Sequence, residues 1–146
     1  MTRGTTHTSW IDPVDKIHPP GYGDLGFQSV IPLGPGPDDP AVVIVQYPPG
    51  RTIPVHSHDA DYCTIVVAGE IDVTRRPETV GDIRIVRGGT AYGPLVVGPE
   101  GCTVIDVFSR RSAIPARFVK AADAAAASRP EVLAHVAQLL GHVDPT

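Results

Sequence analysis

The middle of the sequence alternates short apolar stretches with turns rich in glycine and proline. Period-two alternation and runs of β-branched residues both favour β-strands over helices. Strands are predicted at residues 27–33, 42–47, 62–68, 70–74, 79–86 and 102–109. Strand spacings of about ten residues, with turn signals between them, are typical of a β-sandwich or a small barrel. The sequence therefore predicts an all-β domain.

Glycine-containing positions are predicted to interrupt or separate these strands. Gly69 joins the third and fourth predicted strands, and a turn at Gly81 interrupts the fifth. The sequence VVGPEG, residues 96–101, is predicted as a further turn before the last strand. Glycine favours such positions because it adopts backbone conformations that other residues avoid. We therefore expect short strands joined by many turns.

The two ends of the sequence differ from this strand-rich middle. The N-terminal residues are polar and then rich in proline and glycine, and Trp10 and Tyr22 could hold them on the domain surface. The C-terminal residues have a helical period, with Ser128 predicted as a helix N-cap and Glu131 completing a capping box. The predicted parts are an N-terminal arm at residues 1–25, a barrel at residues 26–120 and a C-terminal helical extension at residues 121–146.

Composition narrows the class of protein. The 146 residues include 15 glycines and 16 prolines. Lysine and arginine number 12 and aspartate and glutamate 16, which gives a formal net charge of −4. Such a mildly acidic chain lacks the basic stretch expected of a protein that binds nucleic acid or an anionic membrane. The N-terminus has no apolar segment and no run reaches membrane-spanning length, so we expect a cytoplasmic protein.

Several predicted strands are apolar on both faces. In the third, Tyr62 and Val66 share one face, while Cys63 and Val67 share the other. One face can fill a barrel interior, but the other must also be covered, and residues 42–45 repeat this pattern. We therefore expect a homodimer, to whose interface the N-terminal arm can contribute.

The most informative stretch contains two histidines, His56 and His58. Histidines at positions i and i+2 of an extended segment project to the same side. Their imidazoles can therefore meet one ion, which is the geometry of a metal-ligand pair. Without a metal, the same residues would form a hydrogen-bonded polar pair at the mouth of a barrel.

This stretch resembles the first motif of the cupin superfamily. That motif is a glycine, five residues, His-x-His, three or four residues, Glu, six residues and a glycine, and it is matched by Gly50, His56, His58 and Gly69. The second cupin motif, Gly-x5-Pro-x-Gly-x2-His-x3-Asn, has its frame at Gly81, Arg87, Gly89, Tyr92 and Val96. The resemblance implies an antiparallel β-barrel of two packed, jelly-roll-like sheets. It implies little about the reaction, because the superfamily hosts many activities.

Departures from these motifs change the implied ligand set. Tyr62 stands at the position of the motif glutamate, and Tyr92 at that of the second-motif histidine. His56 and His58 remain, and Asp61 can supply a carboxylate one residue before the motif glutamate. Two histidines and one carboxylate with open positions suit Fe(II) or another divalent transition metal, without distinguishing iron, zinc, manganese or nickel. Tyr62 is the alternative third ligand if it loses its proton, whose pKa is normally about 10.

The remaining polar candidates have competing interpretations. Tyr62 and Tyr92 can act as acid and base or orient a substrate, or they can be core aromatic residues with hydrogen-bonded hydroxyls. Asp61 can cap a turn instead of binding a metal. Arg84 and Asp106 could anchor a substrate from inside the barrel, but an exposed strand face is the simpler interpretation.

These features predict a small-molecule enzyme that uses one divalent metal ion. The metal would polarise an oxygen-bearing substrate or bind dioxygen, which leaves oxygenase, isomerase, lyase and cyclase chemistry open. The alternative is a metal-free cupin that binds or senses a small ligand, and a third reading is a structural cupin without a ligand. Tight metal binding favours the enzyme, whereas its absence favours the binding protein.

Overall fold

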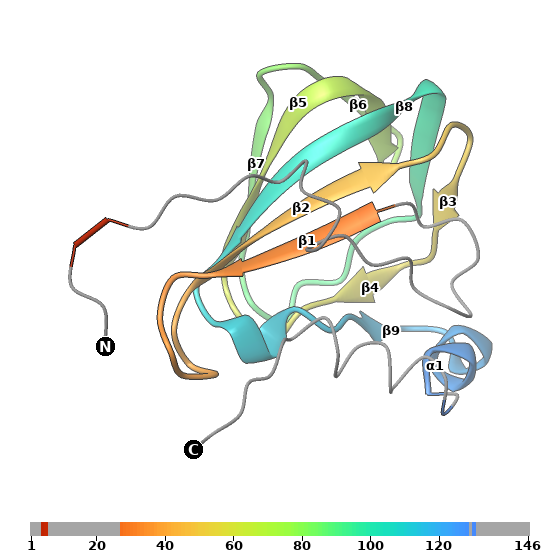
Figure 1. The fold of residues 1–146 in the computed structure, drawn as a ribbon. Helices are drawn as coiled ribbons and strands as arrows, with labels where there is room; N and C mark the ends of the chain where they lie inside the picture. The colour runs from red at the N-terminus through yellow and green to blue at the C-terminus, as the bar shows by residue number, and fades with distance from the viewer. Residues whose placement is uncertain (1–3, 6–26, 129, 131–146) are drawn as a thin grey trace.

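The computed structural model describes residues 4–5, 27–128 and 130, so most of the predicted arm, including Trp10 and Tyr22, lies outside the described residues. The strands are β1 (Phe27–Pro32), β2 (Ala41–Tyr47), β3 (Thr52–Ile53), β4 (His56–Ser57), β5 (Tyr62–Val73), β6 (Arg76–Thr79), β7 (Ile83–Val86), β8 (Leu95–Phe108) and β9 (Arg117–Phe118). A 3-10 helix, η2 (Arg111–Ala113), precedes β9, and an α-helix, α1 (Ala121–Ala127), follows it. These elements confirm the predicted all-β class (Figure 1).

A large antiparallel sheet forms the body of the fold. Its strands run in the order β1-β2-β8-β5-β6, with β3 added against β8 and β7 against β5. The long strands β5 and β8 pair at its centre, and Figure 1 shows the sheet curving over the small antiparallel pair β4–β9. This curvature encloses the inward face of the sheet, where the candidate site lies.

Two predicted strand breaks are wrong, because β5 and β8 are longer than the sequence pattern indicates. β5 continues through Gly69, with register shifts on both sides of it. The predicted turn at residues 96–101 lies inside β8, whereas the turn at Gly81 is confirmed between β6 and β7. A Cβ atom at Gly69 would come within 2.0 Å of the carbonyl oxygen of Gly101. Glycine thus lets the two backbones approach each other where the strands bend.

The two faces of the large sheet differ in what they contain. Residues opposite each other in antiparallel strands share a face. An inward row joins Asp106 on β8 to Thr64 on β5 and Arg84 on β7. The outward rows are Ile31, Val42, Val107, Cys63 and Ile85, and then Ser29, Ile44, Ile105, Ile65 and Ile83. Along the second of these outward rows, residue exposure rises from 6% at Ile44 on β2 to 63% at Ile83 on β7. The homodimer that would cover the exposed isoleucines of β7 stays a prediction.

The C-terminal helical extension is described only in part. α1 lies within it but ends before Ser128, whose hydroxyl donates to the carbonyl oxygen of Ala124 at 2.8 Å. Ser128 therefore closes α1, whereas its predicted capping partner Glu131 lies outside the described residues. In the part of the chain that the structure describes, no helix has the length and apolar character needed to cross a membrane.

Candidate functional site

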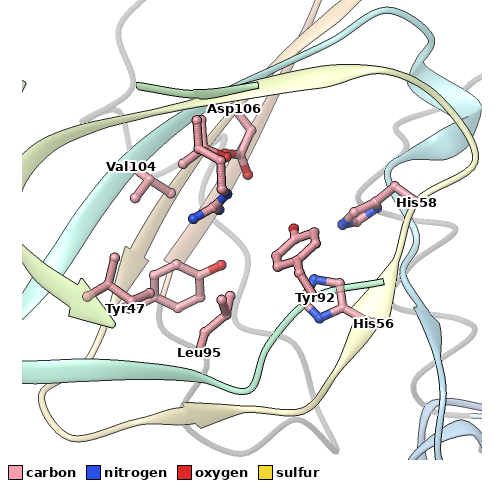
Figure 2. A pocket seen from close by; sticks show the side chains of 10 residues that line it. Tyr47, His56, His58, Tyr92, Leu95, Val104 and Asp106 are labelled. Carbon is pink, nitrogen blue, oxygen red and sulfur yellow. The ribbon is translucent and has the colours of Figure 1, made fainter. Parts of the chain in front are cut away.

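A pocket lies between the inward face of the large sheet and strand β4. It contains about 340 Å³ of empty space, part of it open to solvent, with room inside for only a few water-sized groups. Its wall combines a few aliphatic side chains with many polar ones (Figure 2). The polar lining residues are Tyr47, His56, His58, Thr64, Arg84, Tyr92 and Asp106. A small polar molecule is therefore the kind of ligand that fits.

His56 on β4 and His58 just after it both reach this pocket, as their spacing predicts. Their ring centroids lie 5.2 Å apart. The Nδ1 atom of His56 lies 2.7 Å from the carbonyl oxygen of Pro54, and that of His58 lies 3.0 Å from the carbonyl oxygen of Ala113. A carbonyl oxygen can only accept, so each Nδ1 carries the proton and each Nε2 keeps its lone pair. Metal-binding histidines use this arrangement, with the second ring nitrogen donating to a backbone carbonyl or carboxylate.

Both imidazoles are held in the neutral form. Burial lowers the pKa of His56, against the raising effect of its bond to the Pro54 carbonyl oxygen. Burial also lowers the pKa of His58, to about 4, and the neighbouring His56 lowers it further. Near neutral pH the pair is therefore uncharged and offers two lone pairs on Nε2, which is the state that binds a divalent ion.

Backbone contacts from distant segments fix the two histidines. His56 exchanges two backbone hydrogen bonds with Tyr92, of 3.1 and 3.0 Å, and pairs with Phe118 on β9. The carbonyl group that holds His58 belongs to η2, and the loop between β1 and β2 anchors η2 through two backbone hydrogen bonds. Backbone carbonyl groups thus orient both rings, and aromatic side chains pack against them, with Tyr92 beside His56 and Phe108 beside His58.

Asp61 does not join the histidines. Its side chain is 56% exposed, and its carboxylate accepts hydrogen bonds from the backbone N–H of Gly88 at 2.8 Å and from Arg87 at 3.3 Å. The Gly88 bond is the main reason why the pKa of Asp61 is lowered. Asp61 thus ties the start of β5 to the loop after β7, away from the pocket wall. Within the described residues, no group of three or more His, Cys, Asp or Glu side chains could hold a metal ion.

The two tyrosines occupy different positions. Tyr92 lines the pocket beside His56, with ring centroids 5.0 Å apart, and the guanidinium of Arg84 lies 5.0 Å from the Tyr92 ring centre. Tyr62 is buried and stacks on Phe108, with centroids 4.6 Å apart. The Tyr62 hydroxyl is buried, and burial raises its pKa against the lowering effect of the nearby Arg84 guanidinium. Tyr62 is therefore a neutral core residue, whereas Tyr92 faces the pocket.

The interpretation of Arg84 and Asp106 as part of an exposed strand face is wrong, because both side chains line the pocket. Arg84 forms an ion pair of 2.7 Å with the buried Glu78. Asp106 accepts a hydrogen bond of 2.5 Å from the Thr64 hydroxyl. Burial raises the pKa of Asp106 to about 6, although the Thr64 bond and the charge of Arg84 act in the opposite direction. The pocket thus contains an acid–base group that sequence reasoning placed on the surface.

The alternation of residues along β7 does not show which face of the strand points inward. Arg84 shares its face of β7 with Val86, while two isoleucines occupy the other face, so both faces contain aliphatic residues. The pairing of Arg84 with Thr64 on β5 decides which face points inward. Tyr47, at the end of β2, also lines the pocket, and no feature of the sequence distinguishes it from a core tyrosine.

Comparison with known proteins bears on the fold. No family model and no curated protein matches the chain. A variant of oxalate decarboxylase from Bacillus subtilis matches with a TM-score of 0.51 and 19% identity, over 58% of this chain and 25% of that one. A chain of the Rhodobacter sphaeroides SigE complex with the anti-sigma ChrR matches with a TM-score of 0.49 and 21% identity, over 56% and 44%. KdgF from Halomonas sp. matches with a TM-score of 0.47 and 20% identity, over 57% and 78%.

The likeness to oxalate decarboxylase, together with the observed strand order, shows a cupin-type antiparallel β-fold. This confirms the predicted fold class. The chain spans less than half the length of the first two structures that it matches. At 19% identity the likeness describes the fold alone, so the activity has to be argued from the pocket.

Proposed function

We propose that this chain is a small-molecule enzyme whose pocket uses one divalent metal ion bound by His56 and His58. The observation that carries the proposal is the pair of Nε2 lone pairs, which enter one pocket and are oriented by backbone carbonyl groups on Nδ1. The fold agrees with this proposal, since oxalate decarboxylase from Bacillus subtilis, a structural neighbour, has Mn(II) centres.

The residues present fit a divalent ion as a pair of ligands. Two histidines leave the other coordination positions to water or substrate. Asp61 is not a member of this set, because Gly88 and Arg87 engage its carboxylate. Tyr62 is also outside the set, since burial favours its protonated hydroxyl. With two ligands from the described part of the chain, we expect an ion that a chelator removes readily.

The other pocket residues bind and orient the substrate in this proposal. When bound, the ion polarises a substrate oxygen. Tyr92 is the candidate proton donor because its side chain faces the pocket, while Tyr62 supports the site by packing. Arg84 donates N–H groups, and Asp106 accepts hydrogen bonds or, when protonated, donates one. Oxygenase, isomerase, lyase and cyclase reactions are all compatible with this set.

Metal titration of the chelator-treated protein, purified without a polyhistidine tag, tests the proposal. We expect about one Mn(II) or Fe(II) ion per chain, and an affinity about tenfold lower or worse in His56→Ala and in His58→Ala. Asp61→Asn is the matched control and should keep the wild-type affinity, because Asp61 faces the Gly88 loop. Equal affinity in the wild type and both histidine variants would end the metal proposal.

The second candidate is a metal-free protein that binds or senses a small ligand in the same pocket. It is favoured because the described residues contain no group of three metal ligands. In this case the Nε2 atoms of His56 and His58 accept hydrogen bonds from the ligand. His56→Ala and His58→Ala would then weaken ligand binding and leave the metal content equal to that of the wild type.

A further inference from the structure

We propose that the inner end of the pocket, formed by Tyr47, Arg84 and Asp106, binds a small uncharged molecule that carries a hydroxyl group next to a carbonyl oxygen. Figure 2 shows Tyr47 and Asp106 on the side of the pocket away from His56 and His58. The inference rests on the proposed function for the use of this pocket as a substrate site, but it requires no metal. The position, the charge balance and the hydrogen-bonding groups of the inner end carry it.

Two polar residues of the inner end, Arg84 and Asp106, belong to one cross-strand row with Thr64, while Tyr47 comes from the end of β2. Thr64 lies opposite Asp106 in the β5–β8 pair and opposite Arg84 in the β5–β7 pair, so the three side chains share the inward face. The next inward pair along these strands, Val66 and Val104, is apolar and buried. A polar row within an apolar wall costs free energy unless its groups have partners, so the groups without a protein partner are the ones that a ligand can satisfy.

The charges at the inner end balance without an anion. Arg84 is already paired with Glu78 at 2.7 Å, where only 9% of the Glu78 side chain is exposed. Asp106 adds a second acid, hydrogen-bonded to Thr64. These groups sum to zero when Asp106 is protonated and to one negative charge when it is ionised. A bound carboxylate or phosphate would add an uncompensated negative charge in a poorly solvated pocket, which is unfavourable.

The same residues offer donors and acceptors to an uncharged ligand. Asp106 uses one carboxyl oxygen for Thr64, and its other oxygen can accept from a ligand hydroxyl. Arg84 and Tyr47 both line the pocket, and each carries a donor, a guanidinium group in Arg84 and a hydroxyl group in Tyr47. A carbonyl oxygen beside the ligand hydroxyl can accept from either of these donors. The limited room restricts the ligand to a few non-hydrogen atoms.

Lactamide and lactate are matched probes of this inference, since both place a hydroxyl next to a carbonyl group and they differ in charge. Protein-observed NMR titration of the metal-free protein in chelator, near neutral pH, measures both affinities. We expect lactamide to bind about fivefold more tightly than lactate, or better. Asp106→Asn should weaken lactamide binding about tenfold, because a charged acceptor is lost, and should narrow the preference over lactate.

Two further variants make the test decisive. Asp72→Asn is the matched control, because Asp72 is exposed on β5 and should leave both affinities unchanged. Tyr47→Phe removes a single hydroxyl and should weaken lactamide binding severalfold, so it replaces Asp106→Asn if that variant does not fold.

Three outcomes would overturn the inference. They are tighter binding of lactate than of lactamide, no binding of lactamide, or an unchanged lactamide affinity in folded Asp106→Asn. The proposed metal-dependent function is tested separately, by metal titration of the same protein. Selective lactamide binding without metal binding would keep this inference and overturn only the metal role of His56 and His58.

Discussion

The two faces of strand β7 reverse the usual distribution of residues. Arg84 points into the pocket, while Ile83 and Ile85 on the other face are 63% and 73% exposed. The contrast continues across the sheet, with the polar row of Asp106 and Thr64 inside and aliphatic rows outside. We therefore expect the inward polar row to mark the ligand side of the sheet, and the exposed outward isoleucines to mark a surface that a second copy of the chain covers.

The largest effect is expected from removing the inward cation. Arg84→Ala leaves Glu78 without its 2.7 Å partner in a nearly buried position. We expect a loss of about 3 kcal/mol in the free energy of unfolding, measured by urea denaturation near neutral pH. Arg87→Ala is the control: its ion pair with Asp61 joins side chains that are 79% and 56% exposed, so it should cost less than about 1 kcal/mol. Equal losses in the two variants would contradict the contrast between inside and outside.

Asp106 and His58 should give the metal-free protein opposite pH dependences of stability. Folding raises the pKa of Asp106 from 3.8 to about 6, so its stabilising contribution is full below the lower value and is lost as the pH rises through the higher one. Folding lowers the pKa of His58 from 6.5 to about 4, so its contribution is full above the higher value and is lost as the pH falls toward the lower one.

Single variants separate these two contributions. The quantity compared is the free energy of unfolding of the variant minus that of the wild type. For Asp106→Asn this difference should be more positive at pH 7 than at pH 4.5. For His58→Gln it should be more positive at pH 4.5 than at pH 7. The change in this difference between the two pH values should be on the order of 2 kcal/mol for each variant, because one pKa unit corresponds to about 1.4 kcal/mol. Urea denaturation at both pH values measures it. A variant that keeps the wild-type slope would contradict the pKa shift assigned to its residue.

The smallest effect on stability is expected on the outward face. Ile85→Lys changes a side chain that is 73% exposed, so the unfolding free energy of the monomer should change by less than about 0.5 kcal/mol. Its assembly should change more: we expect a wild-type homodimer that buries on the order of 800 Å² per subunit, and dissociation of the variant. Urea denaturation measures the unfolding free energy, and light scattering over a dilution series measures the assembly of the wild type and of the variant. Val119→Lys, at a position 61% exposed outside the large sheet, is the control, and a wild-type monomer at every concentration would refute the dimer.

Local patterns in the sequence were enough to predict the strand-rich fold and the histidine pair. Alternation of apolar residues located β1, β2 and parts of β5 and β8, because strand formation follows from side chains only a few residues apart. The i, i+2 spacing placed His56 and His58 on one side of an extended segment for the same local reason. These inferences required no knowledge of which strands pair.

The tertiary structure alone decided the rest of the pocket. Asp61 turns away from the histidines because the folded chain brings the Gly88 N–H to its carboxylate. Arg84 and Asp106 face inward because both pair with Thr64, and no local pattern in a strand with aliphatic residues on both faces determines that register. The sequence by itself determined the local geometry of the histidine pair, whereas pairing between distant strands determined which charged residues accompany it.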